Sequence, residues 1–192
     1  MKSTVLKENN STHLKKHGLL YLLLVVVLAV IAYRIQFSPI QKTALNQERP
    51  EVGHPAPAFT LRNLQGNLEG LGDYRNKVIV LNFWATWCAP CLEEMPAFEK
   101  LYRRYRSEGV TVLAVSIDKG GISKVKSFVD KHNLTFPVLI DSDGIAEKLY
   151  PSFTIPFTYV IDKEGRVAAR VDGAKNWASS ETFLALDILI KG

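Results

Sequence analysis

The order of apolar and polar positions along this chain of 192 residues predicts a mixed α/β domain. Two apolar runs, at 78–83 and 110–117, are continuous, which is typical of central strands that are buried on both faces. Segments with a helical period follow both runs. The pattern predicts strands over 58–64, 68–71, 78–83, 110–117, 137–141, 157–162 and 166–171, and helices over 92–108, 123–132, 144–150 and 179–191. This order predicts a mixed central sheet that is flanked by helices.

A stretch without any charged residue, from Gly18 to Tyr33, predicts a membrane-spanning helix near the amino terminus. At the helical rise it would span roughly 24 Å, whereas the hydrocarbon core of a bilayer is about 30 Å thick, so we expect the span to extend to Phe37. A signal peptide that is removed by cleavage is the alternative, since 30–32 offers small residues at a usable spacing. The unbroken apolar run favours an anchor that stays in place.

The lysines before this run predict its orientation, because positive charge favours the cytoplasmic side. We expect 1–17 to be a basic cytoplasmic segment, 18–37 a transmembrane signal-anchor, 38–51 a tether, and 52–192 the folded domain. The chain is then a single-pass protein of the cell membrane, with its domain in the periplasm or outside the cell. Disulfides persist in that compartment, whereas they are rare in the cytosol.

The net charge of +5 belongs to the amino terminus and not to the domain. Residues 1–49 carry seven basic and two acidic side chains, whereas residues 50–192 carry 17 of each kind. A neutral domain gives no support to nucleic-acid binding.

The two cysteines, Cys88 and Cys91, form a Cys-x-x-Cys between the apolar run at 78–83 and the helix that follows. A helix that begins at Cys88 points its unpaired N–H groups and the positive end of its dipole at the sulfur, which favours the thiolate. The thiolate is the nucleophile in disulfide exchange, so this position predicts a thiol–disulfide oxidoreductase. A zinc site would need about four Cys or His ligands, and the four histidines are scattered. A purely structural disulfide would close a very short loop and stabilise the fold little.

The segment Phe83–Cys91, with the sequence FWATWCAPC, resembles the active-site segment of thioredoxin-like proteins. Within it, Thr86-Trp87-Cys88-x-Pro90-Cys91, followed by Glu94-Met95-Pro96, is similar more narrowly to the TlpA/ResA group of membrane-anchored disulfide reductases. The resemblance covers residues 52–190. It implies a thioredoxin-like fold with an amino-terminal β-hairpin addition, a redox-active Cys88–Cys91 disulfide and no cofactor.

Cys88 is predicted to be the attacking sulfur, because it lies at the start of the helix, and Cys91, one turn inward, to resolve the mixed disulfide. The resemblance implies a cis peptide bond before Pro156, beside the cysteines. The strand edge at Ile155 is then expected to pair with an extended segment of the substrate. We expect Trp87 to lie exposed over the active site and to contribute to substrate binding.

Asn82 departs from the thioredoxin pattern, which has a buried aspartate that assists proton transfer to the inner cysteine at the matching position. An asparagine amide cannot do this. Glu94, three residues after Cys91, lies one helical turn from it, and the TlpA/ResA group has a glutamate at this offset. We expect Glu94 to take over the acid–base role or to tune the pKa values of the cysteines. The alternative is an exposed glutamate that the helix dipole favours.

The resemblance implies the reduction of protein disulfides as the reaction. The pair Ala89-Pro90 lacks the histidine of strongly oxidising proteins that resemble DsbA, which favours a reductant. The usual client in the group is an apocytochrome c, and the electrons come from a membrane thiol transporter that resembles CcdA or DsbD.

Two other functions of this fold fit the residues less well. A Sco-like copper chaperone would have a Cys-x-x-x-Cys and a downstream histidine, whereas the spacing here is shorter and only His132 follows the cysteines. A peroxiredoxin-type peroxidase would have Pro-x-x-x-Thr-x-x-Cys, whereas Thr86 stands two residues before Cys88 and no proline precedes it suitably.

Overall fold

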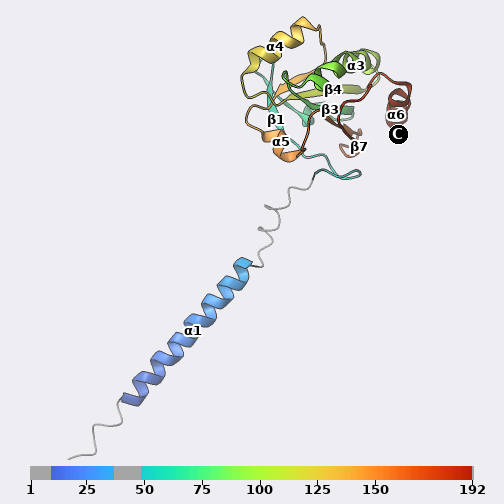
Figure 1. Cartoon of the computed structure of the whole chain (residues 1–192). Coiled ribbons are helices and arrows are strands. Elements are labelled where there is room, and N and C mark those ends of the chain that lie inside the picture. The colour runs from blue at the N-terminus through green and yellow to red at the C-terminus, as the bar shows by residue number, and fades with distance from the viewer. Residues whose placement is uncertain (1–9, 37–48, 192) are drawn as a thin grey trace, which may run out of the picture. The chain divides into compact units, whose positions relative to one another are not determined.

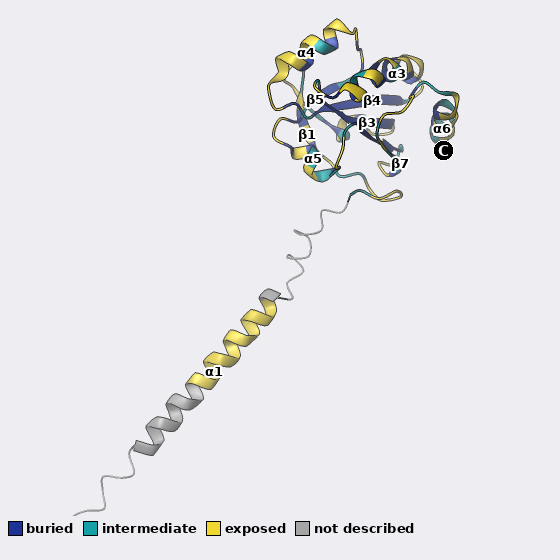
Figure 2. Ribbon diagram, in the orientation of Figure 1, coloured by how far each residue is buried: buried dark blue, intermediate teal, exposed yellow. Residues whose placement is uncertain are grey.

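The computed structural model describes residues 10–36 and 49–191, and the chain divides into two units, 1–47 and 48–192. The first unit contains helix α1 (Asn10–Gln36), whose side chains from 21 to 34 are all exposed (Figures 1 and 2). Among the described residues, no helix combines the length and the hydropathy that a membrane span requires. The predicted anchor at 18–37 reaches beyond this part of the chain, since residue 37 and the side chains of 18–20, 35 and 36 lie outside it. Residues 1–9 and 38–48 of the flanking segments also lie outside it.

The second unit is built on one seven-stranded mixed sheet with the strand order β2-β1-β5-β4-β3-β6-β7 (Figure 1). The three strands β5, β4 and β3 are parallel to one another, and every other neighbouring pair is antiparallel. The strands are β1 (Thr60–Asn63), β2 (Leu68–Gly70), β3 (Val78–Trp84), β4 (Val110–Ser116), β5 (Val138–Ile140), β6 (Phe157–Ile161) and β7 (Val167–Asp172).

Helices cover both faces of this sheet, and Figure 2 shows the strands buried between them. One face packs against α3 (Ala89–Tyr105), α4 (Ile122–Lys131) and α6 (Ser180–Lys191). The other face packs against α5 (Ile145–Leu149) and the short 3-10 helix η1 (Leu71–Tyr74). Because consecutive parallel strands are joined by crossovers of one hand, the connections β3–α3–β4 and β4–α4–β5 place both helices on the same face.

Strand β3 shows why the two faces differ. All seven of its residues are buried, and successive side chains point to opposite faces of the sheet. Val78, Val80 and Trp84 belong to the core under α3, whereas Ile79, Leu81 and Phe83 belong to the core on the other side. Asn82 has the same parity as the first set, so this polar side chain faces α3.

The predicted mixed α/β sheet, its amino-terminal hairpin and its strands are confirmed, with strand ends that differ by one or two residues, and the largest differences lie at the ends of α3. Helix α3 begins at Ala89 and ends at Tyr105, not at 92 and 108, since the Glu108 N–H donates to the Tyr105 carbonyl in a tight turn. Helix α4 begins at Ile122, directly after Gly121, which has a φ of 102°, and not at 123 as predicted. The 3-10 helix η1 was not predicted.

Candidate active site

The two cysteines lie where β3 passes into α3, and they form a disulfide. Cys88 caps the helix: its backbone is extended, and its Sγ accepts a hydrogen bond from the Cys91 backbone N–H at 3.3 Å. A sulfur in this position faces the positive end of the helix dipole, which stabilises a thiolate. Cys88 is 5% exposed and Cys91 is fully buried. An external disulfide therefore reaches Cys88 before Cys91.

A buried carboxylate, Asp118, holds the loop that leads to Cys88. Its Oδ2 accepts hydrogen bonds from the Thr86 backbone N–H at 2.9 Å and from Ser116 Oγ at 2.8 Å, and its Oδ1 accepts from Thr86 Oγ1 at 2.6 Å. Asp118 follows β4, the parallel neighbour of β3, so the ends of the two strands meet at this edge of the sheet. The sequence predictions missed Asp118, although an acidic residue directly after a strand beside the redox strand was a usable signal.

The predicted substrate-binding residues lie at this end of the sheet. The peptide bond between Ile155 and Pro156 is cis, as predicted. Ile155 is half-buried and packs against the hydrophobic cluster that contains both cysteines, Cys88 and Cys91. The Trp87 side chain is 68% exposed, which agrees with the prediction that it lies open to solvent. That these residues bind substrate stays a prediction.

Glu94 is buried, at 4% exposure, so the alternative of an exposed glutamate is wrong. Its Oε1 accepts a hydrogen bond from Asn82 Nδ2 at 3.1 Å. Its Oε2 accepts from the Lys175 backbone N–H at 3.2 Å and from Trp177 Nε1 at 3.1 Å. Burial raises the pKa of Glu94 from 4.5 to about 7, while these three hydrogen bonds oppose the rise because they favour the charged form. Such a carboxyl group exchanges its proton near neutral pH.

Asn82 links Glu94 to the sheet. Its Nδ2 also donates to Thr158 Oγ1 at 3.1 Å, across the antiparallel pair of β3 and β6. Its Oδ1 is buried without a hydrogen-bond partner among the described residues. The position that holds an acid in thioredoxin therefore holds a donor here, and the acid lies on α3. The sequence predictions missed Lys175 and Trp177, which complete this network.

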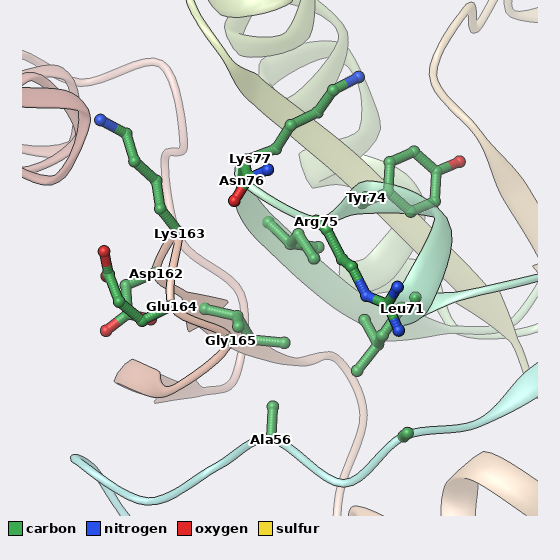
Figure 3. Close-up of a pocket in the computed structure, with 14 residues that line it drawn as sticks. Ala56, Leu71, Tyr74, Arg75, Asn76, Lys77, Asp162, Lys163, Glu164 and Gly165 are labelled. Atoms are coloured by element: carbon green, nitrogen blue, oxygen red, sulfur yellow. The ribbon is translucent and has the colours of Figure 1, made fainter.

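The cysteines belong to no metal-binding cluster among the described residues, and a cavity lies at the other end of β3. Within the described residues, no three His, Cys, Asp or Glu side chains lie together so that they could hold a metal ion. A cavity of about 440 Å³ opens near the start of β3, at the end away from Cys88. Figure 3 shows Ala56, Leu71 and Gly165 around it together with the charged Lys77 and Lys163.

A strand–helix junction that carries a Cys-x-x-Cys beside a cis proline defines a thioredoxin-fold enzyme of thiol–disulfide exchange, and comparisons with known proteins agree. Residues 52–170 match the AhpC/TSA family. The thiol-disulfide oxidoreductase ResA of Geobacillus kaustophilus is 40% identical over 163 residues, which cover 84% of this chain and 90% of the relative. ResA of Bacillus thuringiensis subsp. konkukian is 36% identical over 171 residues, covering 89% and 97%.

Solved structures give the same class. A crystal structure from Chlorobium tepidum, described as a thiol:disulfide interchange protein DsbE, has a TM-score of 0.67 and 28% identity, and covers 74% of this chain and 99% of that one. StoA from Bacillus subtilis has a TM-score of 0.58 and 25% identity, covering 69% and 97%. The chain belongs to the AhpC/TSA family and, within it, to the thiol-disulfide oxidoreductases of the ResA type. Both ResA relatives are named thiol-disulfide oxidoreductases.

Glu94 makes the stability of the oxidised protein depend on pH. The pKa of Glu94 is about 7 in the folded protein and 4.5 in an unfolded chain. Between these two pH values the folded state binds more protons than the unfolded state, so the free energy of unfolding falls as the pH rises through them. At about 1.4 kcal/mol per unit, the loss attributable to Glu94 is at most roughly 3.5 kcal/mol. Urea unfolding at pH 5 and pH 8 should show this loss in the wild type and not in Glu94→Gln.

Glu93→Gln is the matched control, because it removes the same charge from the exposed neighbouring residue. The control should keep the pH dependence of the wild type. The same slope in the wild type and in Glu94→Gln would show that Glu94 does not titrate between these pH values.

Proposed function

We propose that this enzyme is an extracytoplasmic reductase of protein disulfides. The observation that carries the proposal is the asymmetry of the pair: Cys88 caps α3 and is 5% exposed, whereas Cys91 is fully buried next to it. An accessible, thiolate-stabilised sulfur suits attack, and a buried one suits internal resolution.

In the proposed reaction the Cys88 thiolate attacks one sulfur of a substrate disulfide. A Cys88–substrate disulfide forms and the other substrate sulfur leaves as a thiolate. Cys91, as a thiolate, then attacks Cys88 Sγ, which forms the Cys88–Cys91 disulfide and releases the second substrate thiolate. Two electrons pass from the enzyme to the substrate. The substrate segment would lie along Ile155 and Pro156, under the exposed Trp87.

Glu94 is proposed to accept the proton of Cys91 before the resolving step. Glu94 is one helical turn from Cys91, is buried, and has a pKa of about 7, so its ionised form is available as a base near neutral pH. Asn82, at the position where thioredoxin has its acid, donates to Glu94 and cannot accept the proton.

Direction and partners complete the proposal. The lack of a histidine between the cysteines favours a reductant, and the resemblance to the TlpA/ResA group favours an apocytochrome c as the client. A membrane thiol transporter resembling CcdA or DsbD would restore the dithiol. The proposed anchor rests on the sequence, in which no charged residue occurs from Gly18 to Tyr33.

Single cysteine substitutions test the order of attack. The full chain in detergent should reduce the interchain disulfides of insulin, and Cys88→Ala should abolish this because the other cysteine, Cys91, is fully buried. Cys91→Ala should keep one round of attack but accumulate a mixed disulfide, since release needs the second sulfur. Mass spectrometry of the trapped species and a turbidity assay measure both results. Full activity of Cys88→Ala would reject the mechanism.

Glu94→Gln tests proton transfer. The glutamine is nearly isosteric and the Asn82 amide can turn over to accept from it, so the fold should persist. Disulfide exchange should fall roughly 10²-fold above pH 7, where Glu94 is ionised, and the difference should shrink below pH 6. Stopped-flow exchange rates against pH give the profile, with Glu93→Gln as the control. Equal profiles would leave the proton of Cys91 to another group.

Protease accessibility tests the location. A protease added to spheroplasts should digest residues 50–192, and the chain should stay with the membrane after a carbonate wash, because the lysines before the uncharged run at 18–33 favour the cytoplasm. A cytoplasmic protein in the same sample must remain intact as the control. Protection of the domain under these conditions would contradict the proposed topology.

A further inference from the structure

A loop between β7 and α6, the strap (residues 173–179), reaches two parts of the active site. The Gly173 N–H donates to the carbonyl of Pro156 at 2.8 Å, next to the cis bond. The Lys175 N–H and Trp177 Nε1 both donate to Glu94 Oε2. The strap therefore supplies two of the three hydrogen bonds that Glu94 receives, from residues about eighty positions later in the sequence.

Trp177 is held rigidly in this arrangement. It is 2% exposed, and its ring stacks on Phe98 of α3 with a centroid distance of 5.0 Å and an interplanar angle of 20°. Phe98 lies four residues after Glu94, on the same side of the helix. The Nζ of Lys175 lies 5.6 Å from the centroid of the Trp177 ring, on its face. Stacking thus fixes the ring, and the fixed ring aims its N–H at the carboxylate.

We propose that Trp177 is a positioning residue, whose indole N–H holds the Glu94 carboxylate one turn from Cys91 and stabilises its charged form. The proposal rests on the function proposed above, in which Glu94 handles the proton of Cys91, and it adds the residue that makes Glu94 fit for that task. A donor aimed at a buried carboxylate favours ionisation and so opposes burial.

The other groups that face Glu94 are not altered by a substitution of Trp177, so such a substitution tests the proposal. From β3, Asn82 donates to it; from α3, Cys91 titrates only when reduced; from the strap, Lys175 presents its backbone N–H. Replacing Trp177 by phenylalanine changes none of these and keeps an aromatic ring for Phe98. It removes the N–H together with part of the ring volume, and a phenylalanine at a second buried tryptophan, Trp84, removes the same volume without removing a hydrogen bond.

The experiment compares Trp177→Phe with Trp84→Phe in the full chain in detergent. Trp84 is the matched control, since it is equally buried and its Nε1 has no hydrogen-bond partner among the described residues. The carboxyl midpoint of Glu94 is followed by 13C NMR in the oxidised protein, and disulfide exchange is measured against pH. Trp177→Phe should raise the midpoint by about one pH unit, as expected for a lost hydrogen bond to a charged group.

Exchange at pH 7 should then be about fivefold slower in Trp177→Phe, and it should return to the wild-type rate near pH 9, because a shift of one unit leaves the base fully ionised there. Trp84→Phe should leave the midpoint where it is. In the Glu94→Gln background, Trp177→Phe should have no further effect on the pH profile. A purely structural role would instead slow exchange by the same factor at every pH.

An unchanged Glu94 midpoint in Trp177→Phe overturns the proposal, as does an equal shift in Trp84→Phe. Trp177→Phe could raise the Glu94 midpoint while Glu94→Gln leaves the exchange rate unchanged. This result would support the positioning role of Trp177 and reject the proposed role of Glu94 in the reaction. The wild type supplies a measurement that needs no variant: the indole N–H resonance of Trp177 should titrate with the midpoint of Glu94. An indole resonance that does not change with pH overturns the proposal as well.

Discussion

The structure depends on β3, a strand buried on both faces that ends where α3 begins. Full burial means that a polar residue on this strand needs partners within the protein, because water cannot reach it. Asn82 meets this need through Glu94 on α3 and Thr158 on β6. The same junction places the first unpaired N–H groups of α3 at Cys88. The redox pair and the buried polar network are therefore two consequences of one strand–helix connection.

Burying Glu94 is costly, and the surroundings show how the cost is offset. An isolated buried carboxylate would be strongly unfavourable, but here three donors converge on it, and Asn82 is one of them. An aspartate at position 82 would bring a second carboxylate against Glu94, and two like charges at this distance disfavour ionisation of both. The asparagine and the glutamate thus form one unit. The Asn82 Oδ1, which has no partner among the described residues, fits the protonated state of Glu94 as well. If the Asn82 amide turned over, this oxygen could accept a hydrogen bond from the protonated carboxyl group.

The sequence was sufficient for the parts of the fold that depend on local pattern. Continuous apolar runs located β3 and β4, and alternation with a Gly-containing turn located the β1–β2 hairpin. The helical period alone placed the start of α3 too late, at 92, whereas the argument from the cysteines, in which the helix begins at Cys88, agrees with the observed cap. Pro90 in the first turn also indicates the earlier start. The cis bond before Pro156 came from the resemblance, because few X-Pro bonds are cis and nothing local marks this one.

The polar network could not be predicted in the same way, because its contacts join residues that are far apart in the sequence. Asp118 meets Thr86 across 32 positions, and Trp177 meets Glu94 across 83. The spacing of one helical turn between Cys91 and Glu94 does not distinguish an exposed glutamate from a buried one. Whether Glu94 is buried depends on the strap, whose fold has no periodic signal in the sequence.

The environment of Glu94 also explains how a glutamate can serve a thiol. A free cysteine has a pKa of about 8.5, so moving its proton to a glutamate with a pKa of 4.5 would be uphill by roughly 5 kcal/mol. With the pKa of Glu94 raised to about 7, the same transfer is uphill by only about 2 kcal/mol. Full burial of Glu94 without donors would raise the pKa further but leave the base protonated near neutral pH. The donors from Asn82, Lys175 and Trp177 limit the rise, so that in the proposed mechanism the carboxylate is both ionised often enough and basic enough to take the proton of Cys91.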